Sequence, residues 1–376
     1  MAGTPASSGT GGGLTGILEL PARVARLAGD ARARADRLFE VQAISGATVP
    51  PATLEPWLTA TFGSVAAVRE QSLLRVTNLA TLDAAIFAPL RARRPVDGPD
   101  RARDLAAEIA ATDGDPFCDP AHATPADTFG RVRGDRMLTG ANAALADAHH
   151  AVLVFDDHDP LAFDAGLVAD LFTTGRAWAD RARVDDPDAA TYLLLWNCLW
   201  RAGGSIIHGH AQALLGAGRH HARLERFRRD ADAYRARHGA ELVADLQAVH
   251  RDLELAVDRD GITTLAHLTP TKERELLVIG PPGTDERDPP FADAVASALL
   301  AYRDRLGVRS FNLALWRRPL ADREALTGWE SFPTIAWLVD RGDPFTRPSD
   351  IGAMELYGTP IVGSDPYEAI RAIRGA

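Results

Sequence analysis

Residues 204–215 read G-S-I-I-H-G-H-A-Q-A-L-L, a small and apolar run in which polar side chains recur at alternate positions. Successive side chains of a β-strand point to opposite faces, so His208, His210 and Gln212 would share one face. Gly209 between the histidines removes a side chain where close backbone contact would be needed. The pattern predicts a metal site or a nucleophile on this strand.

The two residue types suggest different chemistry. A neutral histidine can attack phosphorus and form a phosphoramidate when an acceptor such as a backbone carbonyl holds its other ring nitrogen. The amide of Gln212 can hold phosphoryl oxygens but cannot serve as an acid or a base. The combination favours transfer onto a second phosphate over hydrolysis.

The composition is that of a large globular protein. The chain has 376 residues, 46% of them hydrophobic, which is enough for two domains or one large two-part domain. A net charge of -10 argues against general binding to nucleic acid or to anionic membranes. The two cysteines form no disulfide framework, so we expect a cytoplasmic location. No apolar run approaches the roughly 18 residues that span a bilayer.

The pattern of apolar residues divides the chain. Residues 1–13 have the composition of a disordered leader, and helical spacing predicts an N-terminal helical extension over residues 14–70. A charged helical divider at residues 226–260 separates a first half, residues 71–225, from a second half, residues 261–376. Strands and helices follow a similar order in both halves. We therefore expect an α+β fold with mostly antiparallel sheets flanked by helices.

Residues 197–212, N-C-L-W-R-A-G-G-S-I-I-H-G-H-A-Q, are similar to the active-site strand of the galactose-1-phosphate uridylyltransferase-like branch of the histidine triad (HIT-like) superfamily. In that branch an asparagine and a glycine-rich stretch with a serine precede H-P-H-x-Q. Asn197 lies eleven residues before His208, which matches the spacing in that branch, and Gly209 replaces the usual proline. The resemblance implies two HIT-like halves.

The resemblance also implies roles for the residues of this segment. It makes His210 the nucleophile that carries the nucleotidyl group and Gln212 the residue that steadies the intermediate. Asn197 and Ser205 become contacts of the phosphate or sugar phosphate. The hydrolase branch has a third histidine where this chain has Gln212, so the transferase or phosphorylase branch is favoured.

Further candidate ligand contacts follow from weaker similarities. Arg75 resembles an N-terminal arginine near the nucleotide, and Asn142 in G-A-N-A-A-L resembles an asparagine that contacts the nucleoside. Lys272 is a candidate phosphate contact, although a surface lysine is the simpler explanation. Glu355 lies in a segment similar to the one that grips the sugar, with Met354 in place of its usual aromatic neighbour.

The resemblance implies a structural zinc site as well. Its ligands would be Asp115, Cys118, His158 and His208, with Asp115 in place of the expected cysteine. Such a mixed set can bind zinc tetrahedrally, but a carboxylate in place of a thiolate weakens the site. Without metal, His158 and His208 would be paired by hydrogen bonds.

The function expected from the resemblance is transfer of a nucleotidyl group from a nucleoside diphosphate sugar through a nucleotidyl-histidine, as in a hexose-1-phosphate uridylyltransferase of carbohydrate metabolism. With inorganic phosphate as acceptor, the enzyme would be a nucleotide-sugar or dinucleoside polyphosphate phosphorylase. A nucleotide-binding protein without turnover is the alternative from another class. The expected partners are a nucleotide sugar and a sugar phosphate or inorganic phosphate, with a homodimer as a further possibility.

Overall fold

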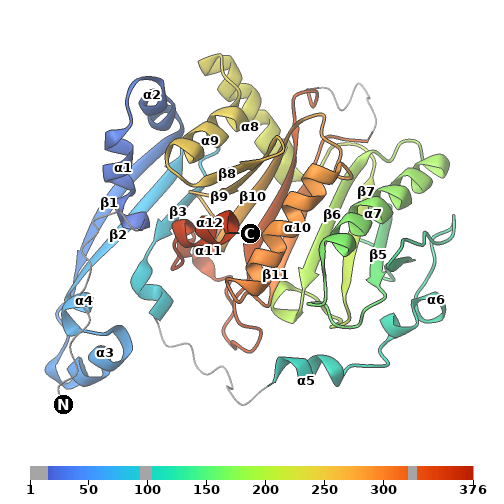
Figure 1. Cartoon of the computed structure of the whole chain (residues 1–376), viewed down its shortest axis with the longest axis horizontal. Helices are drawn as coiled ribbons and strands as arrows, with labels where there is room; N and C mark the ends of the chain where they lie inside the picture. Colours follow the sequence, from blue (N-terminus) through green and yellow to red (C-terminus); the bar gives the residue numbers. More distant parts are fainter. Residues whose placement is uncertain (1–15, 94–103, 321–327, 376) are drawn as a thin grey trace, which may run out of the picture.

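The computed structural model describes residues 16–93, 104–320 and 328–375. The leader expected at residues 1–13 lies outside the described residues. The described chain forms two sheets with helices around them (Figure 1). The expected α+β fold with mostly antiparallel sheets is confirmed.

The larger sheet has nine strands in the order β4-β5-β7-β6-β11-β12-β10-β9-β8, and every neighbouring pair is antiparallel. Four strands come from the first half of the chain: β4 (Met137–Ala141), β5 (His149–Phe155), β6 (Thr191–Cys198) and β7 (His210–Gly216). Four come from the second half: β9 (Ile262–Ala266), β10 (Glu273–Pro282), β11 (Phe311–Trp316) and β12 (Pro333–Asp340). The edge strand β8 (Ala256–Arg259) lies within residues 226–260, where only helix was expected.

The two halves repeat one topology within this sheet. In each half two strands form a hairpin, a helix follows, and two more strands return so that the last strand pairs beside the second. The helices are α7 (Ala165–Asp185) and α10 (Pro289–Asp304), which pack against each other. The halves meet where β6 pairs with β11. Strand β12 is thus the counterpart of β7, and its sequence P-T-I-A-W-L-V-D contains no histidine.

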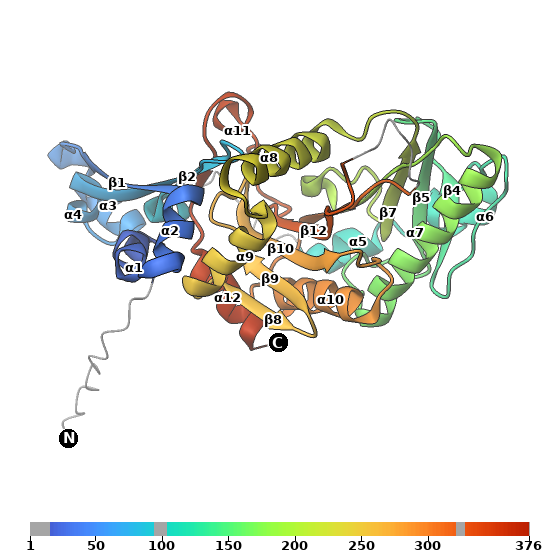
Figure 2. The same ribbon diagram turned by 90° about the horizontal axis from the view of Figure 1, so that it is seen from above.

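Residues 226–260, the expected helical divider, contain most of α8 (Ala222–His238) and all of α9 (Leu242–Asp252), followed by β8. Figure 2 shows α8 on the opposite side of the larger sheet from α10 and α12 (Pro366–Arg374). The ring of Phe227 on α8 contacts Trp316 and Trp337 on that side of the sheet. Residues directly opposite each other on paired strands have their side chains on the same face of the sheet. Trp337 pairs with Ala314, and Ala314 pairs with Leu195, so the face that α8 covers continues to β6 in the first half.

The smaller sheet has the order β1-β2-β3-β13 and gathers distant parts of the chain. Its strands are β1 (Phe39–Ala47), β2 (Glu70–Asn78), β3 (Ala84–Phe87) and β13 (Ile361–Val362). Strand β13 runs parallel to β3, whereas the other pairs are antiparallel. The division of the chain at residues 70, 225 and 260 stays a prediction.

The N-terminal region is helical, as expected, but β1 was not foreseen. The helices are α1 (Leu20–Arg26), α2 (Gly29–Leu38), α3 (Glu55–Phe62) and α4 (Val65–Arg69), and the last two lie between β1 and β2 in the chain. Helices α3 and α4 lie at the far end of the β1–β2 hairpin, which projects from the rest of the molecule (Figure 1). The remaining short helices are α5 (Leu105–Ala110), α6 (Pro120–Ala123) and α11 (Ala353–Tyr357). None of the helices in the described ranges combines the length and apolar composition needed to cross a membrane.

Candidate active site

The histidine segment is divided between a loop and a strand. Strand β7 begins at His210, so His208 lies in the loop before it. That loop is tight, because a Cβ on Gly204 would lie 3.0 Å from the carbonyl oxygens of Asn197 and Leu199. The three polar side chains therefore do not form one uninterrupted row on a strand.

Strand β7 presents different faces to the two sides of the sheet. Ala211, Ala213 and Leu215 are buried in the main core, which also contains the apolar side chains of α7. On the other face, His210 pairs with Val154 of β5, and Gln212 lies between Val152 of β5 and Leu195 of β6. The candidate nucleophile thus belongs to the face without α7, which is the face below α8.

His210 has the geometry that a nucleophile requires. Its Nδ1 donates a hydrogen bond to the backbone carbonyl of His208 at 2.8 Å, so Nε2 carries the lone pair. No described residue hydrogen-bonds to that Nε2. Only 6% of the residue is exposed, and burial lowers the pKa of His210. The ring of Phe117 approaches the imidazole edge-on, with 5.0 Å between centroids.

Gln212 contacts a histidine that the sequence reasoning missed. The Gln212 Oε1 lies 3.0 Å from Nε2 of His150, which is buried at the start of β5. The amide nitrogen of Asn142 lies 3.3 Å from the same Nε2, so the expected nucleoside contact Asn142 is near Gln212. The sequence feature that could have pointed to His150 is the pair His149-His150, which stands immediately before the apolar run of residues 151–155.

The structure brings together the four expected metal ligands. The donor atoms of Asp115, Cys118, His158 and His208 all lie within 4.8 Å of one another. The Cys118 Sγ lies 3.4 Å from His158 Nδ1 and 3.5 Å from His208 Nδ1. The buried Asp115 Oδ2 has no hydrogen-bond partner among the described residues, which leaves it available to a cation.

Hydrogen bonds orient both imidazoles for metal binding. The Nε2 of His158 lies 3.0 Å from the carbonyl of Ile109, and the Nε2 of His208 lies 2.8 Å from that of Phe155. A carbonyl only accepts, so each Nε2 carries the proton and each Nδ1 presents a lone pair. The two Nδ1 atoms are 3.0 Å apart and would repel each other without a cation or a proton between them. Burial lowers the pKa of His208, which disfavours the proton, so these residues fit a metal ion.

A polar network links three of the other predicted residues across the two halves. Asn312 on β11 donates to Asn197 Oδ1 at 2.6 Å and accepts from Arg341 at 2.5 Å. Arg341 in turn binds the Asp350 carboxylate through two hydrogen bonds of 2.7 and 2.9 Å.

The same network continues to the C-terminal segment. The ammonium group of Lys272 donates to the backbone carbonyl of Asp350 and lies 3.9 Å from the Glu355 carboxylate. Glu355 also accepts from the backbone N–H of Gly352 at 2.8 Å. Lys272 and Glu355 are therefore neighbours, although they are far apart in the sequence. Asn312 and Arg341 were not identified from the sequence.

Two predicted ligand contacts lie apart from these clusters. Arg75 is exposed on β2 in the smaller sheet, paired with Gln42 and Ile86. Ser205 is exposed in the loop before β7. The contacts of the described residues connect neither side chain to His210, so their roles stay predictions.

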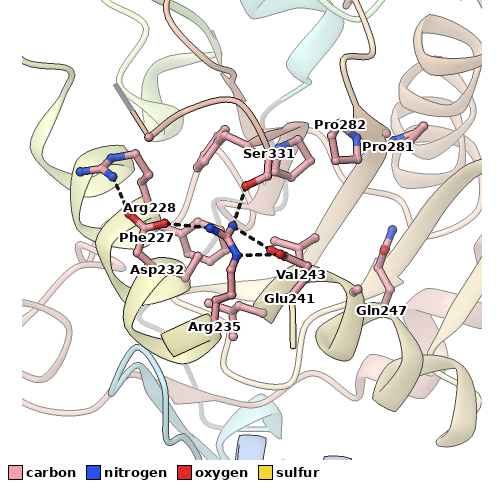
Figure 3. Close-up of a pocket in the computed structure, with 17 residues that line it drawn as sticks. Phe227, Arg228, Asp232, Arg235, Glu241, Val243, Gln247, Pro281, Pro282 and Ser331 are labelled. Carbon is pink, nitrogen blue, oxygen red and sulfur yellow. Dashed lines mark hydrogen bonds and ion pairs between the residues drawn. The ribbon is translucent and has the colours of Figure 1, made fainter. Parts of the chain in front are cut away.

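A pocket of about 350 Å³ lies between α8, α9 and the ends of β10 and β12. Figure 3 shows that Arg235 within it contacts Asp232, Glu241 and Ser331. Its cationic charge is thereby neutralised by carboxylates, and none of the predicted site residues lines the pocket. We therefore place the candidate active site at β7 and not in this pocket.

Comparison with known proteins identifies the fold. No family profile matches the sequence, and no curated protein matches it. An ADP-glucose phosphorylase from Arabidopsis thaliana, solved with bound ADP-glucose, is similar in structure with a TM-score of 0.60 and 16% identity, over 79% of this chain and 96% of that one.

Two further solved structures agree. A galt-like protein from Arabidopsis thaliana has a TM-score of 0.55 and 16% identity, over 69% of this chain and 91% of that one. A uridylyltransferase has a TM-score of 0.53 and 16% identity, over 67% of this chain and 88% of that one. The chain thus has the fold of uridylyltransferase-like proteins, and the fold expected from the resemblance is confirmed.

Proposed function

We propose that this protein is a nucleotidyltransferase that acts on a nucleoside diphosphate sugar through a covalent nucleotidyl-histidine. The observation that carries the proposal is the geometry of His210. Its Nδ1–H is held by the His208 carbonyl, which leaves Nε2 as a neutral nucleophile without a partner among the described residues. The likeness in fold to a phosphorylase solved with ADP-glucose supports a nucleotide sugar as substrate.

The proposed reaction consists of two displacements at the same phosphorus. In the first, His210 Nε2 forms a bond to the α-phosphorus, and the bond from that phosphorus to the bridging oxygen breaks, which releases the sugar 1-phosphate. The imidazole then carries a positive charge, which its hydrogen bond to the His208 carbonyl stabilises. In the second, an acceptor phosphate oxygen attacks the phosphorus, the phosphorus–nitrogen bond breaks, and neutral His210 is restored.

The remaining site residues would bind and orient the phosphates. Gln212 would donate its amide hydrogens to the phosphoryl oxygens, and Asn197 with Ser205 would contact the phosphate or the sugar phosphate. Asn142 would contact the nucleoside, and Arg75 would lie near the nucleotide. For Lys272 and Glu355, which lie 3.9 Å apart, we propose contacts with phosphate and sugar.

Two acceptors fit this mechanism. A hexose 1-phosphate as acceptor would make the protein a uridylyltransferase-like enzyme, whereas inorganic phosphate would make it a nucleotide-sugar or dinucleoside polyphosphate phosphorylase. Because the chain is similar in structure to an ADP-glucose phosphorylase, inorganic phosphate should be tested alongside the hexose 1-phosphate. The test starts from enzyme that carries a labelled nucleotidyl group and incubates it with each acceptor separately. The nucleotide product that is released shows which acceptor the enzyme uses.

We also propose that Asp115, Cys118, His158 and His208 hold zinc. The ion would supply a structural cross-link between the loop before β7 and the segment around Cys118, and take no part in bond cleavage. His208 provides the carbonyl that holds His210, so ordering of His208 also orders the nucleophile. Replacement of Asp115 by Cys is expected to raise the affinity for zinc, and replacement by Ala to lower it, as measured by competition with a chromogenic chelator.

The covalent intermediate provides the decisive test. Wild-type protein incubated with α-labelled UDP-glucose, ADP-glucose or a GDP-sugar should acquire an acid-labile, base-stable label. His210→Ala should abolish the label, whereas a substitution of the exposed His122 should leave it unchanged. Binding without label in the wild type would instead indicate a nucleotide-binding protein without turnover. A cytoplasmic location and a homodimer stay predictions.

A further inference from the structure

The side chain of Gln212 has one anchor among the described residues, and that anchor is His150. The two are on adjacent strands, because β5 pairs with β7 in a register that places Val152 opposite Gln212 and His150 opposite Leu214. His150 is 5% exposed, so its hydrogen bond to Gln212 is shielded from water and stronger than a surface bond would be. No described residue accepts a hydrogen bond from the Gln212 amide nitrogen.

The backbone of Ala146 determines the tautomer of His150. The Ala146 N–H lies 3.2 Å from His150 Nδ1, and a backbone N–H can only donate. Nδ1 must therefore be the acceptor, and the ring proton must be on Nε2. This Nε2–H then donates to the Gln212 Oε1 at 3.0 Å.

The amide nitrogen of Asn142, 3.3 Å from His150 Nε2, is a second donor at that position and cannot accept the ring proton. The Asn142 Oδ1 accepts from the Ala144 N–H at 2.9 Å, which fixes its amide nitrogen on the side that faces His150. Two donors cannot bond to each other, so this amide nitrogen offers His150 Nε2–H no acceptor. Gln212 Oε1 is left as the acceptor of the Nε2 proton.

We infer that His150 is a positioning residue that fixes the amide of Gln212 with both of its hydrogens available to the nucleotidyl phosphate on His210. The inference rests on the proposed function. A free glutamine amide can turn by half a rotation and present its oxygen, which would repel the phosphoryl oxygens. His150 prevents this rotation because its donor holds the amide oxygen.

Two substitutions of His150 separate positioning from packing. Asn places a polar group near the position of Nδ1 but does not reach Gln212, whereas Gln places one near the position of Nε2 and can donate to the Gln212 oxygen. His150→Asn should slow nucleotidylation, measured in a single turnover and normalised to the fraction of sites that label, on the order of tenfold to a hundredfold. His150→Gln should restore most of the rate. His149→Asn is the matched control, since this neighbouring residue contacts Asp186 instead.

A double-mutant cycle with Gln212 tests whether the effect passes through that residue. If it does, His150→Asn should slow wild-type protein but add no further loss to Gln212→Ala. Rate losses that multiply, or a wild-type rate in His150→Asn, would overturn the inference while leaving the proposed function intact. No label in the wild type would instead overturn the proposed function.

The tautomer gives a test that does not depend on turnover. In ¹⁵N-labelled protein, the His150 ring should show a protonated Nε2 and an unprotonated Nδ1 near neutral pH, assigned by the loss of its signals in His150→Asn. The Nε2 proton should shift in Gln212→Ala. A proton on Nδ1, or no response to the Gln212 substitution, would contradict the inference even if the protein had no activity.

Discussion

Gly209 shows how closely one residue in the histidine segment is constrained. A Cβ at this position would lie 2.8 Å from the Phe155 ring and 3.1 Å from the Asp157 carbonyl. The sequence correctly indicated that a close approach occurs here, and the structure shows that the approaching groups belong to the chain itself.

Gly209→Ala should therefore lower the free energy of unfolding by about 1–3 kcal/mol, because the strand end must move to accommodate the methyl group. Urea unfolding measures this change. Gly46→Ala is the control, since a Cβ there meets no heavy atom within 4 Å. Equal stability of the two variants would show that the loop before β7 adjusts without cost.

The buried His250 predicts that the protein is sensitive to acid at a position away from the candidate metal ligands. The side chain is fully buried, and burial together with the nearby His267 lowers its pKa from 6.5 to about 3. In the unfolded chain the imidazole takes up a proton near its ordinary pKa. The unfolded state therefore binds more protons than the folded state between these two values, and stability falls as the pH falls from 6.5 toward 3.

Replacement of His250 by Phe should remove this contribution while keeping a ring next to Phe39 and His267. Between pH 6.5 and pH 5.5 the wild type should lose about 1 kcal/mol more stability than the variant. Urea unfolding at each pH gives the difference, and a substitution of the exposed His122 serves as control. Parallel pH profiles for wild type and His250→Phe would contradict the assignment.

At the scale of single residues, some members of the candidate site could be predicted from the sequence and others could not. The alternating pattern of residues 204–215 predicted roles for His210 and Gln212, and the resemblance to a known family implied the four candidate metal ligands. His150 was not identified, because its partnership with Gln212 depends on which residues of β5 and β7 lie opposite each other. Strand register is set by tertiary packing and by turns, and the local pattern of one segment does not give it.

At the scale of elements, α7 supports β7 from the far side of the sheet. Its N-cap Asp164 accepts from the Leu167 N–H at 2.9 Å, and this backbone hydrogen bond is the main reason why the pKa of Asp164 is lowered. Such a cap stabilises a helix by satisfying one of its free N–H groups.

Asp164→Ala should lower the free energy of unfolding by about 1 kcal/mol, and Asp164→Asn should recover part of that loss because the amide oxygen can still cap. Thermal unfolding followed by circular dichroism measures both variants. The fraction of sites that become labelled should remain unchanged, since Asp164 is not part of the site. An equal loss in both variants would indicate that the ion pair with Arg136 matters more than the cap.

Some strands could be recognised from the sequence and others could not. The apolar runs at residues 151–155 and 191–196 are typical of buried strands, and they lie in β5 and β6. Strand β1 was missed, although Phe39, Val41 and Ala43 alternate with polar Glu40 and Gln42. That alternation is short, and it follows directly on the helical pattern of α2. Its strand character becomes evident only through its nine-residue pairing with β2.

At the scale of the whole molecule, the two halves share one sheet. The pairing of β6 with β11 means that neither half can lose its sheet without exposing an edge of the other. The sequence predicted a similar order of strands and helices in the two halves. It did not predict that β6 pairs directly with β11.

A cavity in one half should consequently destabilise both. Leu299→Ala, at a fully buried position on α10 in the second half, should cost about 2–5 kcal/mol. Native-state hydrogen exchange should show a similar loss of protection for the slowest amides of β7 and β10. Loss confined to β10 would show that the halves open independently despite the shared sheet.

The hydrogen bond between Asn312 and Asn197 has a consequence for the synthesis of the protein. The two residues are 115 positions apart, so the ribosome completes the histidine segment well before the residue that holds Asn197 exists. Arg341 and Asp350, which hold Asn312 in turn, follow later still, and β13 is added to the smaller sheet after them. A nascent chain that has only its first half can already contain the proposed nucleophile His210, yet it lacks the contacts between Asn197, Asn312 and Arg341. Catalytic competence should therefore arise late in translation, and prematurely terminated chains should remain inactive even when they carry every histidine of the site.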